Sequence, residues 1–177
     1  MKYICFFLLL NLTVLYSCNH KKNYTSGVKV VMPTKIEIYS PFGADTSRAF
    51  LTDKHSPIKI YTLINASCAT CLDKIEKWDK FQSENPDFSK VPIIPVCISK
   101  DSFAMLKFLF DSHRIKSMHL PMVLDLQDSF ARLNRTVITT DAFTALTDAE
   151  NRILVGGDPL ENEKVRAQFL DAMHNVK

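Results

Sequence analysis

The stretch IKIYTLINASCATCLDKIEKW, residues 58–78, contains the pattern that decides the fold. Its first nine residues form a short apolar run rich in β-branched and aromatic side chains, which predicts a buried β-strand. Apolar residues then recur at helical spacing over 72–81, and Asn85-Pro86 ends that pattern. Cys68 and Cys71 therefore stand where a strand ends and a helix begins.

The rest of the chain continues this alternation of strands and helices. Strands alternating with helices imply parallel strand pairs, and a terminal hairpin adds an antiparallel edge. These patterns predict an α/β sandwich with a mixed sheet. The expected elements are two short strands around Pro33 in 28–40, strands at 91–99 and 121–126, a helix over 101–115 capped by Asp101 or Ser102, a helix from 129, a hairpin over 142–157 turning at 148–151, and a helix over 162–174.

Composition and charge exclude several function classes. The 177 residues are 46% hydrophobic and 23% charged, which suits one globular domain with a core. The formal net charge of +3 is spread without a basic stripe, so no nucleic-acid partner is expected. Only four glycines occur, which excludes a glycine-rich phosphate loop.

The N-terminal sequence MKYICFFLLLNLTVLYSC has the pattern of a targeting segment. A basic start at Lys2 precedes an apolar stretch that is too short to span a membrane as a mature helix. The ending Leu15-Tyr16-Ser17-Cys18 resembles a bacterial lipobox. We therefore expect residues 1–17 to be a signal peptide, Cys18 to carry lipid, and 18–27 to form a tether. An ordinary signal peptide with an incidental cysteine is the alternative.

The count of cysteines predicts one pair and one single thiol. Removal of residues 1–17 leaves Cys18, Cys68, Cys71 and Cys97. If Cys18 carries lipid, three thiols remain in an envelope compartment where disulfides persist.

The position of the CxxC pair has a chemical use. The first turn of a helix presents unpaired N–H groups and a partial positive charge, and both favour a thiolate. Cys68, nearer the helix end, is expected to have the lower pKa and to be the attacking sulfur. Cys71, one turn further, would resolve the mixed disulfide.

Three other interpretations of the pair are open. A structural zinc site needs four ligands, and the sequence offers no second Cys or His pair at suitable spacing. A permanent structural disulfide would close a tiny loop and stabilise little. Copper delivery would need His113 or His119 as a third ligand, although the thiols of such domains usually stand one residue further apart.

Four stations of the sequence carry a family resemblance. The chain from about residue 58 to 173 resembles the TlpA/ResA-like branch of the thioredoxin superfamily, AhpC/TSA-type envelope proteins in lipid-anchored form. This resemblance implies a thioredoxin-like three-layer sandwich over 58–177, an N-terminal β extension over 28–57, and dithiol chemistry at the two cysteines. The matching segments are IKIYTLINAS with Cys68-Ala-Thr-Cys71, VPIIPVCISKDS, HLPMVLDLQDSFARL and TALTDAENRIL.

The sequence departs from that family at three positions. Ser67 stands where Trp usually precedes the first cysteine; a serine can cap the helix but cannot shield the sulfur. Ala142, or a neighbour in 140–142, stands where a cis-proline is usual, and a trans peptide is expected there. Lys74 replaces a frequent acidic residue, and its helical direction favours exposure. A peroxiredoxin is not expected, because position 65 is Asn rather than Thr.

The remaining conspicuous residues are expected to be structural. Cys97 lies mid-strand among Ile and Val, where cysteine behaves as a small hydrophobe. Trp78 shares its helical register with core residues. The histidines show no shared spacing and are expected in solvent or as caps: His55, His113, His119 and His174.

The sequence thus predicts an envelope-facing, lipid-anchored thiol–disulfide oxidoreductase that needs no cofactor. Its expected partners are envelope proteins with dithiols or disulfides, a membrane redox partner, and the membrane itself through the lipid. The periplasmic side is favoured because 19–22 lacks an acidic run. A thioredoxin-like binding module with little turnover is the second hypothesis, and copper delivery is the third.

Overall fold

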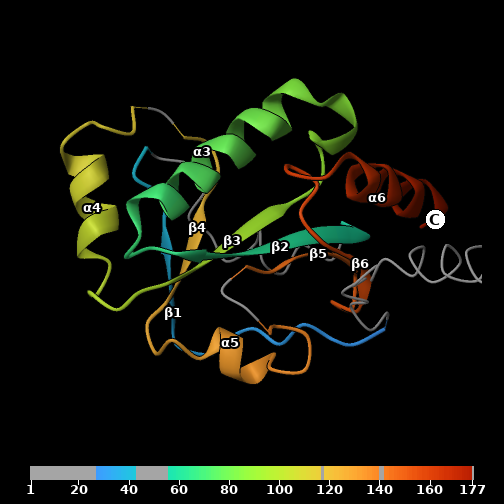
Figure 1. Cartoon of the computed structure of the whole chain (residues 1–177), viewed down its shortest axis with the longest axis horizontal. Coiled ribbons are helices and arrows are strands. Elements are labelled where there is room, and N and C mark those ends of the chain that lie inside the picture. Colours follow the sequence, from blue (N-terminus) through green and yellow to red (C-terminus); the bar gives the residue numbers. More distant parts are fainter. Residues whose placement is uncertain (1–26, 43–55, 117, 140–141, 177) are drawn as a thin grey trace, which may run out of the picture.

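The computed structural model describes residues 27–42, 56–116, 118–139 and 142–176 (Figure 1). The strand and helix expected on either side of the CxxC pair are confirmed, and Asn85 ends that helix just before Pro86. In chain order the elements are β1 (Ile36–Tyr39), β2 (Ile58–Asn65), α3 (Ala69–Glu84), the short 3₁₀ helix η1 (Pro86–Phe88), β3 (Ile93–Ile98), α4 (Ala104–Asp111), β4 (Met122–Asp125), α5 (Phe130–Leu133), β5 (Thr144–Asp148), β6 (Ile153–Gly156) and α6 (Glu163–Asn175).

Six strands form one mixed sheet in the order β1-β4-β3-β2-β5-β6. The central pairs β2–β3 and β3–β4 are parallel, whereas β1, β5 and β6 run antiparallel to their neighbours. Helices α3, α4 and α6 cover one face of the sheet and α5 covers the other (Figure 1). The predicted three-layer α/β sandwich with a mixed sheet is therefore confirmed.

Strand β2 lies at the centre of the sheet and is buried on both faces. Ile60 and Ile64 pack into the core under α3, α4 and α6, while Tyr61 and Leu63 pack into the core on the α5 face. This follows from the alternation of side chains along a strand. It explains why β2 reads as a continuous apolar run, and it gives the CxxC pair a rigid base.

The N-terminal segment differs from its prediction. Only the second of the two expected strands forms: β1 pairs antiparallel with β4, while Lys29 makes a single bridge to Arg152. Before Pro33, the Val31 N–H donates to Asn134 Oδ1 at 2.7 Å, and Asn134 Nδ2 donates to the Val31 carbonyl at 2.8 Å. A side-chain amide thus takes the backbone groups of Val31 that a neighbouring strand would need.

Helix α4 is shorter than the predicted 101–115. Ser102 and Phe103 have φ of 55° and 64°, in the left-handed region, so the helix begins only at Ala104. Of the two expected caps, the Asp101 carboxylate accepts the Met105 N–H at 3.1 Å. The helix stops early because His113 again has a positive φ of 55°.

The C-terminal hairpin and helix match their predictions. Asn151 closes the turn between β5 and β6 with φ 65°, a conformation that Asn tolerates better than most residues. Asn162 caps α6 by accepting the N–H groups of Lys164 and Val165. No helix in the described ranges is both long and apolar enough to cross a membrane.

Candidate active site

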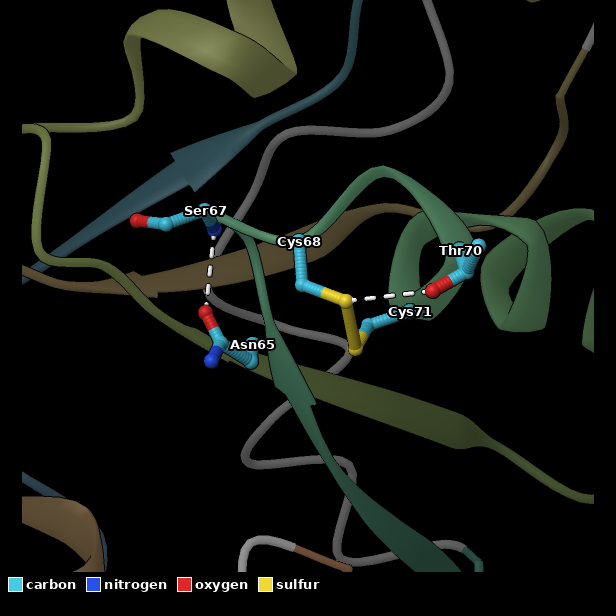
Figure 2. The surroundings of a disulfide bond; sticks show 5 residues. All are labelled: Asn65, Ser67, Cys68, Thr70 and Cys71. Carbon is cyan, nitrogen blue, oxygen red and sulfur yellow. Dashed lines mark hydrogen bonds between the residues drawn. A yellow bond between two sulfur atoms is a disulfide. The ribbon is translucent and has the colours of Figure 1, made fainter.

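Cys68 and Cys71 form a disulfide at the point where β2 leads into α3, with their Cα atoms 5.2 Å apart (Figure 2). Cys68 is the N-cap residue of α3 and has extended backbone angles, while Cys71 lies in the first helical turn. Both side chains are partly exposed. The pair is therefore accessible to another sulfur, as a redox centre requires.

The start of α3 favours negative charge on Cys68. The Cys68 carbonyl accepts the N–H groups of Cys71 at 3.0 Å and Leu72 at 3.1 Å, so the helix begins at this residue. No side chain caps the helix, and its first turn contains no acidic residue. Ser67, whose side chain could cap a helix, does not cap α3, because Cys68 occupies the N-cap. The partial positive charge of the helix start is left for the sulfur.

Thr70 adds a direct contact to the first sulfur. Its Oγ1 lies 3.3 Å from Cys68 Sγ (Figure 2). In the disulfide the sulfur carries no hydrogen, so the threonine hydroxyl is the donor. After reduction, the same hydroxyl can donate a hydrogen bond to a Cys68 thiolate and so favour the thiolate over the thiol. Sequence reasoning missed Thr70, although it stands between the cysteines.

Ser67 turns its side chain away from the disulfide (Figure 2). It joins a polar cluster with Ser99 and Asp101. Its hydroxyl donates to Asp101 Oδ1 at 2.8 Å, lies 3.2 Å from Ser99 Oγ, and accepts the Lys100 N–H at 2.8 Å. The hydrogen bond from Ser99, and to a smaller extent the one from Ser67, hold the pKa of the Asp101 carboxyl below its usual value. The cluster joins the residues after β2 to those after β3.

Sequence reasoning singled out Ser67 without these partners. A usable signal was present, because parallel strands β2 and β3 bring their carboxyl ends to one edge of the sheet. Ser67 and Ser99 each follow such an end closely. The cluster fixes the backbone just before Cys68 by hydrogen bonds, at the position where a Trp ring would shield the sulfur in the similar family.

Lys74 lies on α3, one turn beyond Cys71. The prediction that it is exposed is wrong. Its side chain is 19% exposed, and Nζ forms an ion pair with Asp158 Oδ2 at 2.6 Å. Nζ also lies 3.4 Å from Thr144 Oγ1, which in turn lies 3.0 Å from Thr62 Oγ1. The carboxylate from the loop before α6 draws the lysine inward, which the helical pattern alone could not indicate.

Ala142 lies two residues before the start of β5 and is exposed. The next residue, Phe143, accepts the Leu63 N–H of β2 at 2.8 Å, which places this end of β5 beside the strand that leads to the CxxC pair. The described residues contain no cis peptide bond. Residues 140 and 141, the alternative positions for the cis-proline of the similar family, lie outside the described ranges.

The other candidate residues do not join the disulfide. Cys97 is fully buried, and burial raises the pKa of its thiol to about 12. Trp78 is fully buried in the core, as predicted. His113 and His119 are exposed, and no group of three or more potential metal ligands forms among the described residues. Cys18 and His55 lie outside the described ranges.

Sequence comparison finds no family model that matches this chain and no curated protein that matches it. Comparison with solved structures finds similar folds. A protein described as the thiol:disulfide interchange protein DsbE from Chlorobium tepidum superposes with a TM-score of 0.55 at 15% identity, covering 84% of this chain and 97% of its own. Yeast Sco1 gives 0.52 at 16% identity, covering 84% and 94% respectively.

A third similar structure is a thioredoxin-related protein from Neisseria meningitidis serogroup B. It superposes with a TM-score of 0.51 at 14% identity, covering 79% of this chain and 98% of its own. At such identities the similarity concerns the fold alone. The chain therefore has a thioredoxin-like fold, as the resemblance implied.

Proposed function

We propose that this chain is a thiol–disulfide oxidoreductase whose reacting groups are Cys68 and Cys71. The observation that carries the proposal is the partly exposed disulfide at the start of α3, directly after the central strand of a thioredoxin-like fold. The N-cap position of Cys68 and the Thr70 hydroxyl both favour a thiolate once the bond is reduced.

In the reducing direction, the Cys68 thiolate attacks one sulfur of a substrate disulfide. A Cys68–substrate disulfide forms, and the other substrate sulfur leaves as a thiolate. The Cys71 thiolate then attacks Cys68 Sγ, which re-forms the Cys68–Cys71 bond and releases the second substrate sulfur as a thiolate. Two electrons pass from the protein dithiol to the substrate disulfide, and the same steps in reverse oxidise a substrate dithiol.

The proposed place of action is the bacterial envelope, and this part of the proposal rests on the sequence of residues 1–18 rather than on the fold. 

The apolar stretch that ends at Ser17-Cys18 supports removal of residues 1–17 as a signal peptide and lipid attachment at Cys18. Residues 18–27 would then be a tether, followed by the β extension 28–57 and the redox domain 58–177. Two acyl chains or more would hold such a protein firmly at a membrane.

This placement determines the expected partners. They are envelope proteins that present a disulfide or a dithiol, and a membrane protein that exchanges electrons with the Cys68–Cys71 pair. The periplasmic side is proposed because Asn19-His20-Lys21-Lys22 contains no acidic run. Neither step of the exchange needs a dissociable cofactor.

A second candidate function is a binding module that keeps its cysteines but turns over slowly. The similar family usually has Trp at the position of Ser67 and a cis-proline at Ala142 or a neighbour in 140–142, and the absence of both favours this alternative. A Cys68→Ser/Cys71→Ser double variant separates the two functions. A binding module keeps its partner affinity in that variant, whereas an oxidoreductase loses its cellular effect.

The proposed reaction is tested by exchange between the purified protein and glutathione. Reduced protein is expected to cleave bis(2-hydroxyethyl) disulfide, a small neutral substrate, and the Cys68–Cys71 pair is expected to equilibrate with defined ratios of reduced and oxidised glutathione. A potential near about −270 mV would indicate a reductant and one near about −120 mV an oxidant. Failure to exchange with any test disulfide would refute the enzymatic function.

Lys74 is proposed to influence the potential of the pair. Lys74 stands one turn after Cys71 on α3, so the proposal is that its positive charge favours the Cys71 thiolate. The Lys74→Met variant removes this charge and leaves Asp158 unpaired, and both changes disfavour the reduced form. The potential is expected to become more negative by about 15–30 mV, up to a tenfold change in the equilibrium constant.

The matched control for this prediction is Lys77→Met, an exposed lysine on the same helix. It removes the same charge without touching Asp158 and is expected to leave the potential close to that of the unmodified protein. Glutathione equilibration measures all three proteins. An unchanged or more positive potential in Lys74→Met would contradict the role of Lys74.

A further inference from the structure

A cavity of about 270 Å³ opens beside the disulfide, between the first half of α3 and the C-terminal end of α4. Ala69 and Thr70, the two residues between the cysteines, line it. Its apolar lining comes from Leu72 on α3, Leu109 on α4 and Ile115 in the segment after α4. Thr70 connects the cavity to the redox pair, because it lines the cavity and its hydroxyl contacts Cys68 Sγ.

The charged lining of this cavity consists of two carboxylates, Asp73 and Glu76, and one guanidinium, Arg114. Asp73 and Glu76 on α3 are exposed, and neither forms an ion pair within the described ranges. Arg114 also lines the cavity, but its guanidinium lies over the Phe108 ring, 5.7 Å from the ring centre. Two unpaired carboxylates next to apolar side chains favour a ligand that is both apolar and cationic.

The helix sets the distance between these carboxylates and the reacting sulfur. Thr70 Oγ1 contacts Cys68 Sγ, and Asp73 and Glu76 stand three and six residues further along α3. At 1.5 Å per residue these positions are roughly 4.5 and 9 Å along the helix axis from Thr70. An extended polypeptide advances about 3.3 Å per residue, so it covers this span in about one to three residues.

We propose that this cavity docks the polypeptide segment beside the reactive cysteine of a partner protein, and that it selects segments with Lys or Arg about one to three residues from that cysteine. The proposal rests on the oxidoreductase function proposed above and specifies its substrate class. The segment's cation lies between Asp73 and Glu76, while an apolar neighbour packs against the partly exposed Leu109.

The surroundings of this chain's own cysteines argue against a second copy as the occupant. Residues 65–71, NASCATC, contain no charged side chain, so a docking copy would bring no cation within three residues of Cys68. Lys74 stands three residues after Cys71, but it is already paired with Asp158. Cys97 is buried and cannot react with another chain. A different protein therefore fits the cavity better.

The test compares rates of cleavage of matched peptide disulfides by the reduced full chain. Each peptide carries one cysteine bonded to 2-mercaptoethanol, with either Lys or Glu two residues before or after that cysteine. Lys peptides are expected to react about threefold to tenfold faster than Glu peptides on at least one side, as expected for one or two exposed ion pairs. The ratio should fall as salt is added.

The Asp73→Asn/Glu76→Gln variant should bring the Lys-to-Glu rate ratio close to one. The matched control Glu84→Gln/Asp87→Asn removes the same charge near the far end of α3 and should keep the ratio of the unmodified protein. A ratio near one in the unmodified protein, or an unchanged ratio in Asp73→Asn/Glu76→Gln, overturns the docking proposal.

Four further outcomes distinguish this proposal from its alternatives. If the unmodified protein cleaves bis(2-hydroxyethyl) disulfide but does not discriminate among the peptides, only the docking proposal fails; if it cleaves neither, the proposed function fails as well. A dimer that dissociates in Asp73→Asn/Glu76→Gln makes a second copy the occupant and overturns the proposal. Faster cleavage of Lys peptides by Lys21→Gln/Lys22→Gln makes the tether the occupant, with the same consequence.

Discussion

Replacing Cys68 with serine is expected to lower the rate of disulfide cleavage by about a thousandfold or more, to the uncatalysed level. A serine hydroxyl is not ionised near neutral pH and cannot replace the thiolate that attacks the substrate. The loss should not reflect unfolding, because Cys68 is the N-cap residue of α3 and serine is among the preferred residues at that position.

Replacing Cys71 with serine should give a different result from the same reaction. Cys68 can still attack, but no second thiol is present to release the substrate, so the mixed disulfide accumulates. Mass spectrometry of Cys71→Ser mixed with a single-cysteine peptide disulfide should show one peptide attached per protein. In cells, the same variant should retain disulfide-linked partners that dithiothreitol releases.

Cys97 provides the control for both variants. Its side chain is fully buried and its thiol pKa is raised to about 12 by that burial, so it stays protonated near neutral pH. Cys97→Ala should therefore cleave test disulfides at close to the rate of the unmodified protein. A peptide attached to Cys97 in Cys71→Ser, or full activity in Cys68→Ser, would contradict the assignment of Cys68 as the attacking sulfur.

The main elements of the fold could be predicted because their signals are local. The apolar run of β2, the helical spacing of α3 and the turn at 148–151 each depend on neighbouring residues. The failures involve long-range contacts. The first expected strand is absent because Asn134, a hundred residues away in sequence, bonds the backbone of Val31.

The candidate site also divides into features with local sequence signals, which could be predicted, and long-range contacts, which could not. The CxxC pair and its place before a helix could be found from residues 58–78 alone. The partners of Ser67 and Lys74 could not, since Asp101 and Asp158 reach them from other loops. Lys74 illustrates the difference, because its position on the helix predicted exposure and a carboxylate more than eighty residues later buries it. The chemistry is local in sequence, whereas its electrostatic surroundings are assembled by the fold.

Replacing Trp78 with alanine is expected to lower the free energy of unfolding by about 3–5 kcal/mol. Trp78 is fully buried between α3 and the sheet, and its ring meets Phe81 edge to face at 5.6 Å. The substitution leaves a cavity beneath the helix that carries both cysteines. Because Trp78 is the only tryptophan, urea unfolding of this variant should be followed by far-ultraviolet circular dichroism.

Trp78→Phe should cost much less than Trp78→Ala, about 1.5 kcal/mol or less. The indole nitrogen of Trp78, Nε1, is buried and has no hydrogen-bond partner among the described residues. Burying such an unsatisfied donor lowers the free energy of unfolding by about 1–3 kcal/mol. Phenylalanine has a smaller ring and loses some packing, but it also removes the unsatisfied donor. The loss of packing and the gain from removing the donor therefore partly cancel. Lys77→Ala, on the exposed side of α3, should change stability by no more than about 0.5 kcal/mol. Equal losses in Trp78→Phe and Trp78→Ala would mean that the indole N–H has a partner after all, and that the packing under the redox helix depends on it.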